Sequence, residues 1–259
     1  MEQLELPGHV PGRLLLKHLT SAARLPRPAF TVDPLREIVA YRDILPSVAL
    51  DTPRYIASDT RPGTACLVIE LVDGHPLWQA PGLRCWEAAA RWLASLHAVS
   101  PPALPGPIRY DAAEIRRRIE LARWMPGVTQ VAALVAERLA RLPRCLVHGE
   151  FYPANVLVDD SSNSARIRPV DWETIGIGPA VLDLAALTAG WDEAARRRIE
   201  GSYRAACPPA ARPDEADIDL ARLVLAAQWS GWSEAWTAPP EQRRDWRAEL
   251  RELTGRISP

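Results

Sequence analysis

The sequence contains almost no lysine. Among its 31 basic residues, Lys17 is the one lysine and all the others are arginine. The two side chains are not interchangeable, because a guanidinium is a planar fork of donors whereas an ammonium is a compact point charge. A lone lysine close to the N-terminus therefore marks a position where an ammonium could have a task that arginine does not perform.

The chain also lacks a surplus of positive charge and any long apolar run. Its formal net charge is −1, which argues against a nucleic-acid partner or an anionic membrane surface, since both favour a clear basic excess. No stretch approaches the ~18 continuous apolar residues of a membrane span. The beginning, MEQLELPGHV, is acidic and has no basic segment followed by an apolar run. We therefore expect a cytoplasmic protein.

Cysteine pairs are absent as well. The cysteines are widely scattered and form no C-x-x-C pair; they are Cys66, Cys85, Cys145 and Cys207. This spacing is typical of reduced, mostly buried thiols and excludes an obvious disulfide framework or zinc motif.

The N-terminal part has the pattern of a small mixed α/β unit. A turn at Pro7–Gly12 leads into an expected strand at Arg13–Leu19, which carries Lys17. Asp33-Pro34 is a helix start, with a capping side chain and a proline at the first helical position. The helix continues through REIVAYRDIL with apolar residues at helical spacing, namely Leu35, Ile38, Val39 and Leu45. A short apolar strand, CLVIEL, then leads to a hinge near Leu71–Gly74, so we expect a first unit at residues 1–72.

The remaining residues, 73–259, are expected to form a mainly helical unit. A helix ends near Ala98 and is followed by the proline-rich joint SPPALPGP. Two further helices are expected at about 111–124 and 128–141. Three short segments follow, RCLVHGE, NVLVDD and ARIRPVDW, and the latter two flank a polar turn and predict a hairpin. From Val181 onward the pattern is again helical.

The segment whose residues could carry out a reaction is LVHGEFYPANVLVDD together with the following RPVDWE. It places Glu150, Asn155 and Asp171 at the ends of short adjacent strands. Phosphoryl transfer needs such a set, because one carboxylate orients or deprotonates an acceptor hydroxyl while an amide and a second carboxylate hold Mg²⁺ against nucleotide phosphates. We take His148 in this segment to be a structural residue that holds the loop.

This segment resembles the aminoglycoside phosphotransferase and choline kinase family, whose loop reads H-G-D-x-x-x-x-N and is followed by an aspartate on the next strand. His148, Gly149, Asn155 and Asp171 match that pattern, and Asp183 matches a further aspartate that the family commonly carries.

Weaker matches extend the resemblance to roughly residues 13–246. Lys17, Glu37 and the strand CLVIELVDG are similar to the nucleotide-gripping lysine, its glutamate partner and the hinge. The segment AAQWSGWSEAW resembles helices that help to form the acceptor pocket.

The resemblance implies a protein-kinase-like α+β fold with a reduced N-terminal lobe and a helical C-terminal lobe. It implies transfer of the γ-phosphate of ATP, or of GTP, to a hydroxyl of a small molecule. In that scheme Glu150 is the base that orients the acceptor, and Asn155 and Asp171 hold Mg²⁺. Lys17, paired with Glu37, contacts the phosphates, and the hinge backbone at Glu70–Val72 receives the nucleotide base.

Two departures from the family pattern leave alternatives open. Glu150 stands where the family has aspartate, and only 16 residues precede Lys17, so we expect the glycine-rich loop over the phosphates to be missing or rudimentary. We therefore expect weak nucleotide binding unless a partner chain completes the N-terminal lobe. A pseudokinase-like binding protein without turnover, or a kinase of a peptide Ser/Thr hydroxyl, remains an alternative.

The tryptophans near the C-terminus allow two interpretations. Trp229, Trp232 and Trp236 recur at helical spacing, which is more typical of core packing than of a ligand platform.

Overall fold

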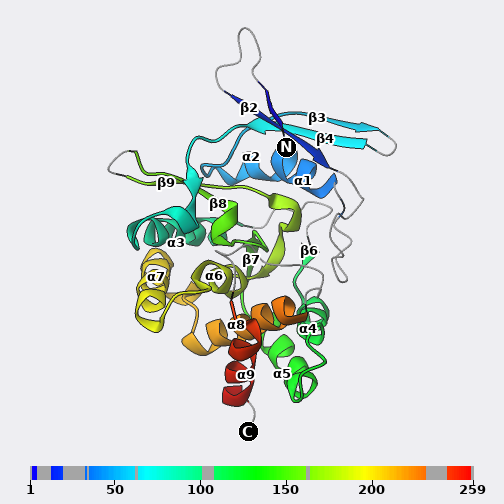
Figure 1. The fold of residues 1–259 in the computed structure, drawn as a ribbon, viewed down its shortest axis with the longest axis vertical. Helices are drawn as coiled ribbons and strands as arrows, with labels where there is room; N and C mark the ends of the chain where they lie inside the picture. The colour runs from blue at the N-terminus through cyan, green and yellow to red at the C-terminus, as the bar shows by residue number, and fades with distance from the viewer. Residues whose placement is uncertain are drawn as a thin grey trace.

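The computed structural model describes residues 13–19, 33, 35–61, 64–100, 108–161, 164–231 and 244–257, together with the backbone of residues 2–4. The chain forms an N-terminal sheet above a larger helical part, and the hairpin of β8 (Val156–Asp159) and β9 (Arg166–Pro169) lies between them (Figure 1). The predicted turn at Pro7–Gly12 lies outside the described residues, as do Trp232 and Trp236.

The N-terminal sheet is antiparallel and has the strand order β1-β2-β4-β3. Its strands are β1 (Glu2–Leu4), β2 (Leu14–Leu19), β3 (Tyr55–Arg61) and β4 (Thr64–Glu70). Lys17 on β2 is paired in register with Leu67 on β4. Alternate residues of β4 are buried, as expected for a strand with one face on the core. Strand β3 was not predicted, because its sequence YIASDTR is largely polar.

One helical segment packs beneath this sheet (Figure 1) and comprises α1 (Leu35–Val39), the π-helical η1 (Ala40–Ile44) and α2 (Leu45–Val48). The predicted capping side chain is present, because Oδ1 of Asp33 accepts a hydrogen bond from the backbone N–H of Leu35 at 2.9 Å. The prediction of the apolar face of this helix was wrong at its N-terminal end. Leu35 is 42% exposed while Glu37 is buried, because the helix turns Glu37 rather than Leu35 toward the strand that carries Lys17.

The rest of the chain is mainly helical, as predicted (Figure 1). Its helices are α3 (Arg84–His97), α4 (Ala112–Glu120), α5 (Val128–Ala140), α6 (Val181–Thr188), α7 (Glu193–Ala206), α8 (Glu215–Gly231) and α9 (Trp246–Ile257). Short 3-10 turns are η2 (Leu77–Gln79), η3 (Pro153–Asn155), η4 (Trp172–Thr174) and η5 (Pro209–Ala211). None of the helices in the described ranges is both long and apolar enough to cross a bilayer.

Two small sheets hold the segments that were predicted to carry the chemistry. One contains β5 (His75–Pro76), β8 (Val156–Asp159) and β9 (Arg166–Pro169), and the predicted hairpin is its antiparallel β8–β9 pair. The other contains β6 (Ile108–Arg109), β7 (Arg144–Val147) and β10 (Gly176–Pro179). Strand β10 escaped prediction because its sequence, GIGP, has the composition of a turn. Gly178 is required there, since a Cβ would lie 2.7 Å from Cβ of Tyr110.

The cysteines behave as predicted. All are free; Cys66 is half-buried and the other three are buried.

Candidate active site

The loop after β7 is held by a buried carboxylate. Asp183 at the start of α6 accepts hydrogen bonds from the backbone N–H groups of His148 at 2.7 Å and Gly149 at 2.8 Å. His97 at the end of α3 lies 3.2 Å from the same carboxylate and is itself bonded to Tyr203 at 2.7 Å. Because backbone donors bonded to a carboxylate form strong, directional contacts, Asp183 fixes where the loop leaves the strand.

Gly149 allows the loop to turn tightly against its neighbours. Its φ is +86°, and a Cβ at this position would collide with the hydroxyl of Tyr110 and lie 2.5 Å from the carbonyl oxygen of Thr174. The hydroxyl of Tyr110 donates to that same carbonyl at 2.7 Å, and the hydroxyl of Thr174 donates to the carbonyl of His148 at 3.0 Å. Glycine is therefore needed here for both backbone conformation and space.

His148 joins the loop to the strand that precedes Asp171. Its Nδ1 accepts from the backbone N–H of Glu150 at 3.3 Å, which leaves Nε2 to donate to the carbonyl of Val170 at 3.0 Å. Complete burial lowers the pKa of His148 below its usual value, although the Asp183 charge opposes this. A neutral imidazole with both nitrogens occupied positions its neighbours and is not available as a base.

Asn155 lies at the end of the same loop, half-buried. Its Nδ2 donates to the carbonyl of Glu150 at 3.0 Å, and its backbone carbonyl accepts from the N–H of Val170 at 2.8 Å. Because the amide nitrogen is occupied in this way, Oδ1 is the atom of Asn155 suited to bind a cation. The loop and the segment leading to Asp171 are thus connected by two hydrogen bonds at Val170, whose carbonyl accepts from His148 and whose N–H donates to the carbonyl of Asn155.

Asp171 meets the lone lysine. Its Oδ1 lies 2.7 Å from Nζ of Lys17, and Nζ also lies 2.6 Å from Oε1 of Glu37. The Asp171 side chain is 39% exposed whereas that of Glu37 is 2% exposed. One ammonium therefore connects β2, α1 and the turn after β9, which are far apart in sequence.

Burial and the short distances among Lys17, Glu37 and Asp171 determine the charges of these side chains. Burial alone would lower the pKa of Lys17, but the carboxylates of Glu37 and Asp171 outweigh burial and raise the pKa above its ordinary value. Burial raises the pKa of Glu37, with Lys17 acting in the opposite direction. Lys17 consequently stays charged at any physiological pH.

The residues of the predicted hinge, Glu70 to Val72, make different contacts. The Glu70 carboxylate is bound by Arg168 on β9, with two contacts of 2.8 Å. The backbone N–H of Leu71 donates to the carbonyl of Arg13 at 2.8 Å. Val72 follows as half-buried backbone beyond the end of β4. Arg168 was not identified from the sequence, because nothing in the pattern distinguishes it from the other arginines.

Glu150 is half-buried in the loop next to an aromatic group that includes Tyr152. Nε1 of Trp229 on α8 donates to the hydroxyl of Tyr152 at 2.8 Å, and the rings of Trp229 and Trp246 stack with centroids 6.1 Å apart. Trp229 thus lies against the loop that carries Glu150.

The donor set fits a hard cation such as Mg²⁺. In the described part of the chain, no cluster of three or more His, Cys, Asp or Glu side chains could hold a metal ion. Asn155 and Asp171 offer an amide oxygen and a carboxylate, the oxygen ligands that Mg²⁺ prefers, and Mg²⁺ in phosphate-transferring sites takes few protein ligands. The small number of ligands is therefore compatible with a metal that is completed by phosphates and water.

An N-terminal antiparallel sheet above a mainly helical part, with a lysine, a glutamate and a loop of this kind, is the arrangement of the protein-kinase-like fold. The chain belongs to the phosphotransferase enzyme family, whose sequence pattern matches residues 18–217. None of the curated proteins matches the chain.

Solved structures of aminoglycoside and choline kinases share this fold. Choline kinase LicA from Streptococcus pneumoniae is 15% identical over 98% of this chain and 94% of its own, with a TM-score of 0.68. Aminoglycoside phosphotransferase APH(3'')-Id from Streptomyces rimosus is 19% identical over 76% of this chain and 80% of its own, with a TM-score of 0.58. A microcompartment-associated aminopropanol kinase is 16% identical over 95% and 84%, also with a TM-score of 0.58. These structural relatives act on small molecules.

Proposed function

We propose that the protein transfers the γ-phosphoryl group of ATP or GTP to a hydroxyl group of a small molecule. The observation that carries the proposal is the contact of Lys17 with both Glu37 and Asp171, at 2.6 Å and 2.7 Å. These three residues come from separate elements and meet beside the loop that carries Glu150 and Asn155. Phosphoryl transfer depends on positioning and on neutralising phosphate charge, and this arrangement offers both.

The nucleotide would lie between the hinge and this group. Its base would contact the backbone near Glu70–Val72, and its α- and β-phosphates would contact the Lys17 ammonium, whose pKa is raised by the two carboxylates. Structures of related proteins in complex with nucleotides support the proposal: APH(3'')-Id with ADP and streptomycin, and LicA with AMP.

Asn155 and Asp171 would hold the metal, and Mg²⁺ when bound would neutralise part of the phosphate charge. Asn155 is prepared for this by its bond to the Glu150 carbonyl, which directs Nδ2 inward. Asp171 is prepared by the turn that follows β9, in which its backbone is held at a φ of 68°. Both residues are therefore held in place by contacts within the protein.

Glu150 would orient the acceptor hydroxyl and accept its proton. A glutamate has nearly the same intrinsic pKa as an aspartate, ~4.3 against ~3.9, so either is ionised at neutral pH and they differ mainly in reach. The acceptor would approach from the side of Tyr152 and Trp229, which are joined by a 2.8 Å hydrogen bond next to the loop. The acceptor is thus bounded by an aromatic surface.

The test is nucleotide turnover by Glu150 variants. ADP or GDP formation should be followed with Mg·ATP or Mg·GTP and a panel of amino alcohols and aminoglycosides. Glu150→Gln should lower turnover by at least ~100-fold, the typical effect of losing a general base. Glu150→Asp should also be slower than the parent, because its carboxylate is withdrawn. Glu120→Gln, an exposed change on α4, is the matched control and should leave turnover unchanged.

The outcomes separate the proposed reaction from the alternatives. Undiminished turnover in Glu150→Gln would remove this residue from the mechanism, and faster turnover in Glu150→Asp would show that the longer side chain is not adapted to its task. Saturable nucleotide binding without turnover on any small molecule would favour a binding protein. Turnover on Ser/Thr peptides alone would favour a peptide kinase.

A further inference from the structure

Arg168 forms a dense set of contacts behind the candidate active site. It lies on β9, and its guanidinium faces the N-terminal sheet. Its Nη1 and Nη2 each bind one carboxylate oxygen of Glu70 at 2.8 Å, and Nη2 also donates to the carbonyl of Thr52 at 3.0 Å. Its Nε lies 3.0 Å from Oδ1 of Asp51. The Arg168 side chain is 9% exposed, so these contacts are sheltered from solvent.

The partner carboxylate is next to the hinge. Glu70 is the last residue of β4 and directly precedes the Leu71–Gly74 hinge. The hydrogen bonds from Arg168 are the main reason that the pKa of Glu70 falls to about 2, although burial opposes them. A bidentate pair of this kind is among the stronger charge-assisted contacts and fixes orientation as well as distance.

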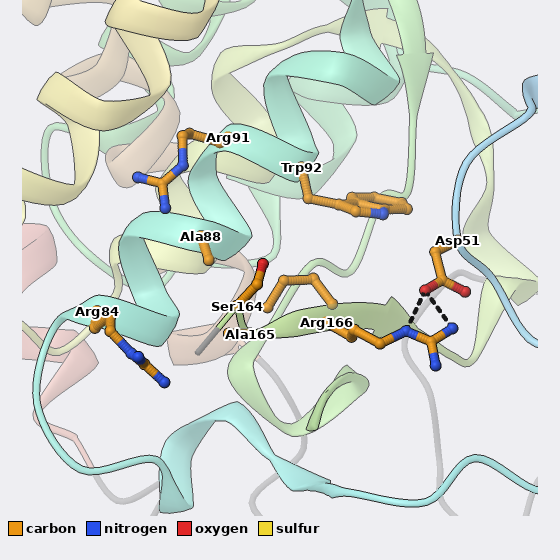
Figure 2. Close-up of a pocket in the computed structure, with 9 residues that line it drawn as sticks. Asp51, Arg84, Ala88, Arg91, Trp92, Ser164, Ala165 and Arg166 are labelled. Atoms are coloured by element: carbon orange, nitrogen blue, oxygen red, sulfur yellow. Dashed lines mark hydrogen bonds and ion pairs between the residues drawn. The ribbon is translucent and has the colours of Figure 1, made fainter. Parts of the chain in front are cut away.

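Arg166 provides an internal comparison on the same strand. It also binds Asp51, through Nε at 3.0 Å and Nη2 at 2.9 Å. Figure 2 shows this pair at the edge of a cavity of about 530 Å³ that is also lined by Trp92 and Arg84. The Arg166 side chain is 57% exposed, and exposed ion pairs contribute little. Arg166 shares Asp51 with Arg168, yet the structure gives it no contact with Glu70.

The strand that carries Arg168 also leads to Asp171. Only Pro169 and Val170 separate the two residues, and Val170 is bonded to both His148 and Asn155. A nucleotide with its base at the hinge and its phosphates at Lys17 and Asp171 spans the two ends of this connection. The Arg168–Glu70 contact joins these two ends directly.

We propose that Arg168 is a positioning residue that sets nucleotide affinity by holding the hinge at a fixed distance from Asp171. The inference rests on the proposed function, and it assigns to Glu70 a side-chain task in addition to the expected backbone contact. Arg168 touches neither phosphate nor acceptor in this scheme and acts through the two segments that it joins.

The experiment compares Arg168→Met with Arg166→Met. Both remove one arginine from β9 and one partner from Asp51, but only the first detaches the hinge. In Arg168→Met the KM for the nucleotide should rise about 10-fold, less than the ~100-fold that a 1 Å displacement of reacting groups costs. The kcat and the KM for the acceptor should stay within about 3-fold. Arg166→Met should alter none of these by more than about 2-fold.

A second measurement does not depend on activity. Hydrogen exchange of peptides that cover residues 70–76 should be faster in Arg168→Met than in the parent, and unchanged in Arg166→Met. Glu70→Gln keeps the side-chain shape and should reproduce the Arg168→Met result, which covers the case in which Arg168→Met does not fold. Arg168→Lys should be intermediate, because an ammonium cannot reproduce the fork.

The results separate this inference from the proposed function. Unchanged exchange at the hinge in both Arg168→Met and Glu70→Gln would overturn the inference whatever the protein catalyses, as would equal effects of Arg166→Met and Arg168→Met on the nucleotide KM. A parent protein that neither binds nor turns over nucleotide, but whose hinge loosens in Arg168→Met, would refute the proposed function and with it the assigned effect on affinity.

Discussion

Two cations tie the N-terminal sheet to the segment around Asp171, and they do so in different ways. Lys17 contacts single oxygens of Glu37 and Asp171 at 2.6 Å and 2.7 Å, within the candidate active site. Arg168, on β9, donates hydrogen bonds to both carboxylate oxygens of Glu70. An ammonium holds its carboxylate partners by charge and has room to contact a bound phosphate as well, whereas a guanidinium fork fixes geometry. The comparison offers a reason why an arginine-rich chain places its lone lysine at this position.

Removal of the carboxylate shared with the lysine should have the largest effect. Asp171→Ala takes away a metal ligand under the proposed function, and we expect Mg-dependent nucleotide turnover to fall on the order of 1,000-fold, as for loss of a preorganised charge contact. Calorimetric titration with Mg·ATP checks binding, and circular dichroism checks the fold. A folded Asp171→Ala protein with unchanged Mg·ATP affinity would contradict the metal assignment.

Exchange of the lysine for the other cation tests the comparison directly. Lys17→Arg retains the charge but places a planar fork among Glu37, Asp171 and the phosphates, and we expect turnover to fall about 100-fold through misplacement. Arg109→Lys on β6 is a control for the reverse exchange at an exposed position. If Lys17→Arg were as active as the parent, the distinction drawn between ammonium and guanidinium would fail here.

The smallest expected effect is on acid stability. Because Arg168 lowers the pKa of Glu70 to about 2 in the folded protein, the pair stabilises the fold fully above the unfolded pKa of ~4.3 and loses that contribution as the pH falls toward 2. With a discount for partial exposure, we expect Glu70→Gln to be about 1 kcal/mol less stable than the parent at pH 6.

Urea unfolding at several pH values measures this difference. The difference in the free energy of unfolding between the parent and Glu70→Gln should become smaller as the pH is lowered from 4.5 to 3. A gap that is constant with pH would show that the carboxylate charge is not what holds the pair together.

The loop and its neighbours could be predicted from the sequence because their chemistry is local. Glu150 follows β7, Asn155 directly precedes β8 and Asp171 follows β9, and the hairpin that places Asp171 was predicted from the polar turn between its two strands. Lys17 and Glu37 were predicted as partners from the resemblance to the kinase family, and the structure places Nζ of Lys17 2.6 Å from Oε1 of Glu37. Their tasks toward a nucleotide, a metal and an acceptor remain predictions.

Other features depend on long-range packing that no local pattern reveals. Asp183 was singled out by the resemblance alone, and its task as a buried acceptor for two backbone N–H groups could not be predicted from its place in an apolar helix. The Arg168–Glu70 contact joins β9 to β4, and an arginine-rich sequence gives no sign of which arginine is buried. Glu37 faces Lys17 on β2 and is buried, so regular helical spacing of apolar residues misplaced Leu35.

The backbone of Asp171 has a consequence for engineering. Its φ of 68° and ψ of 58° lie in the left-handed region, which costs roughly 1–2 kcal/mol for a residue with a Cβ and nothing for glycine. Glycine at this position would relieve the strain while removing the carboxylate. A directed-evolution campaign that ranks variants by melting temperature alone would therefore favour the loss of this side chain, because stability and activity make opposite demands on residue 171.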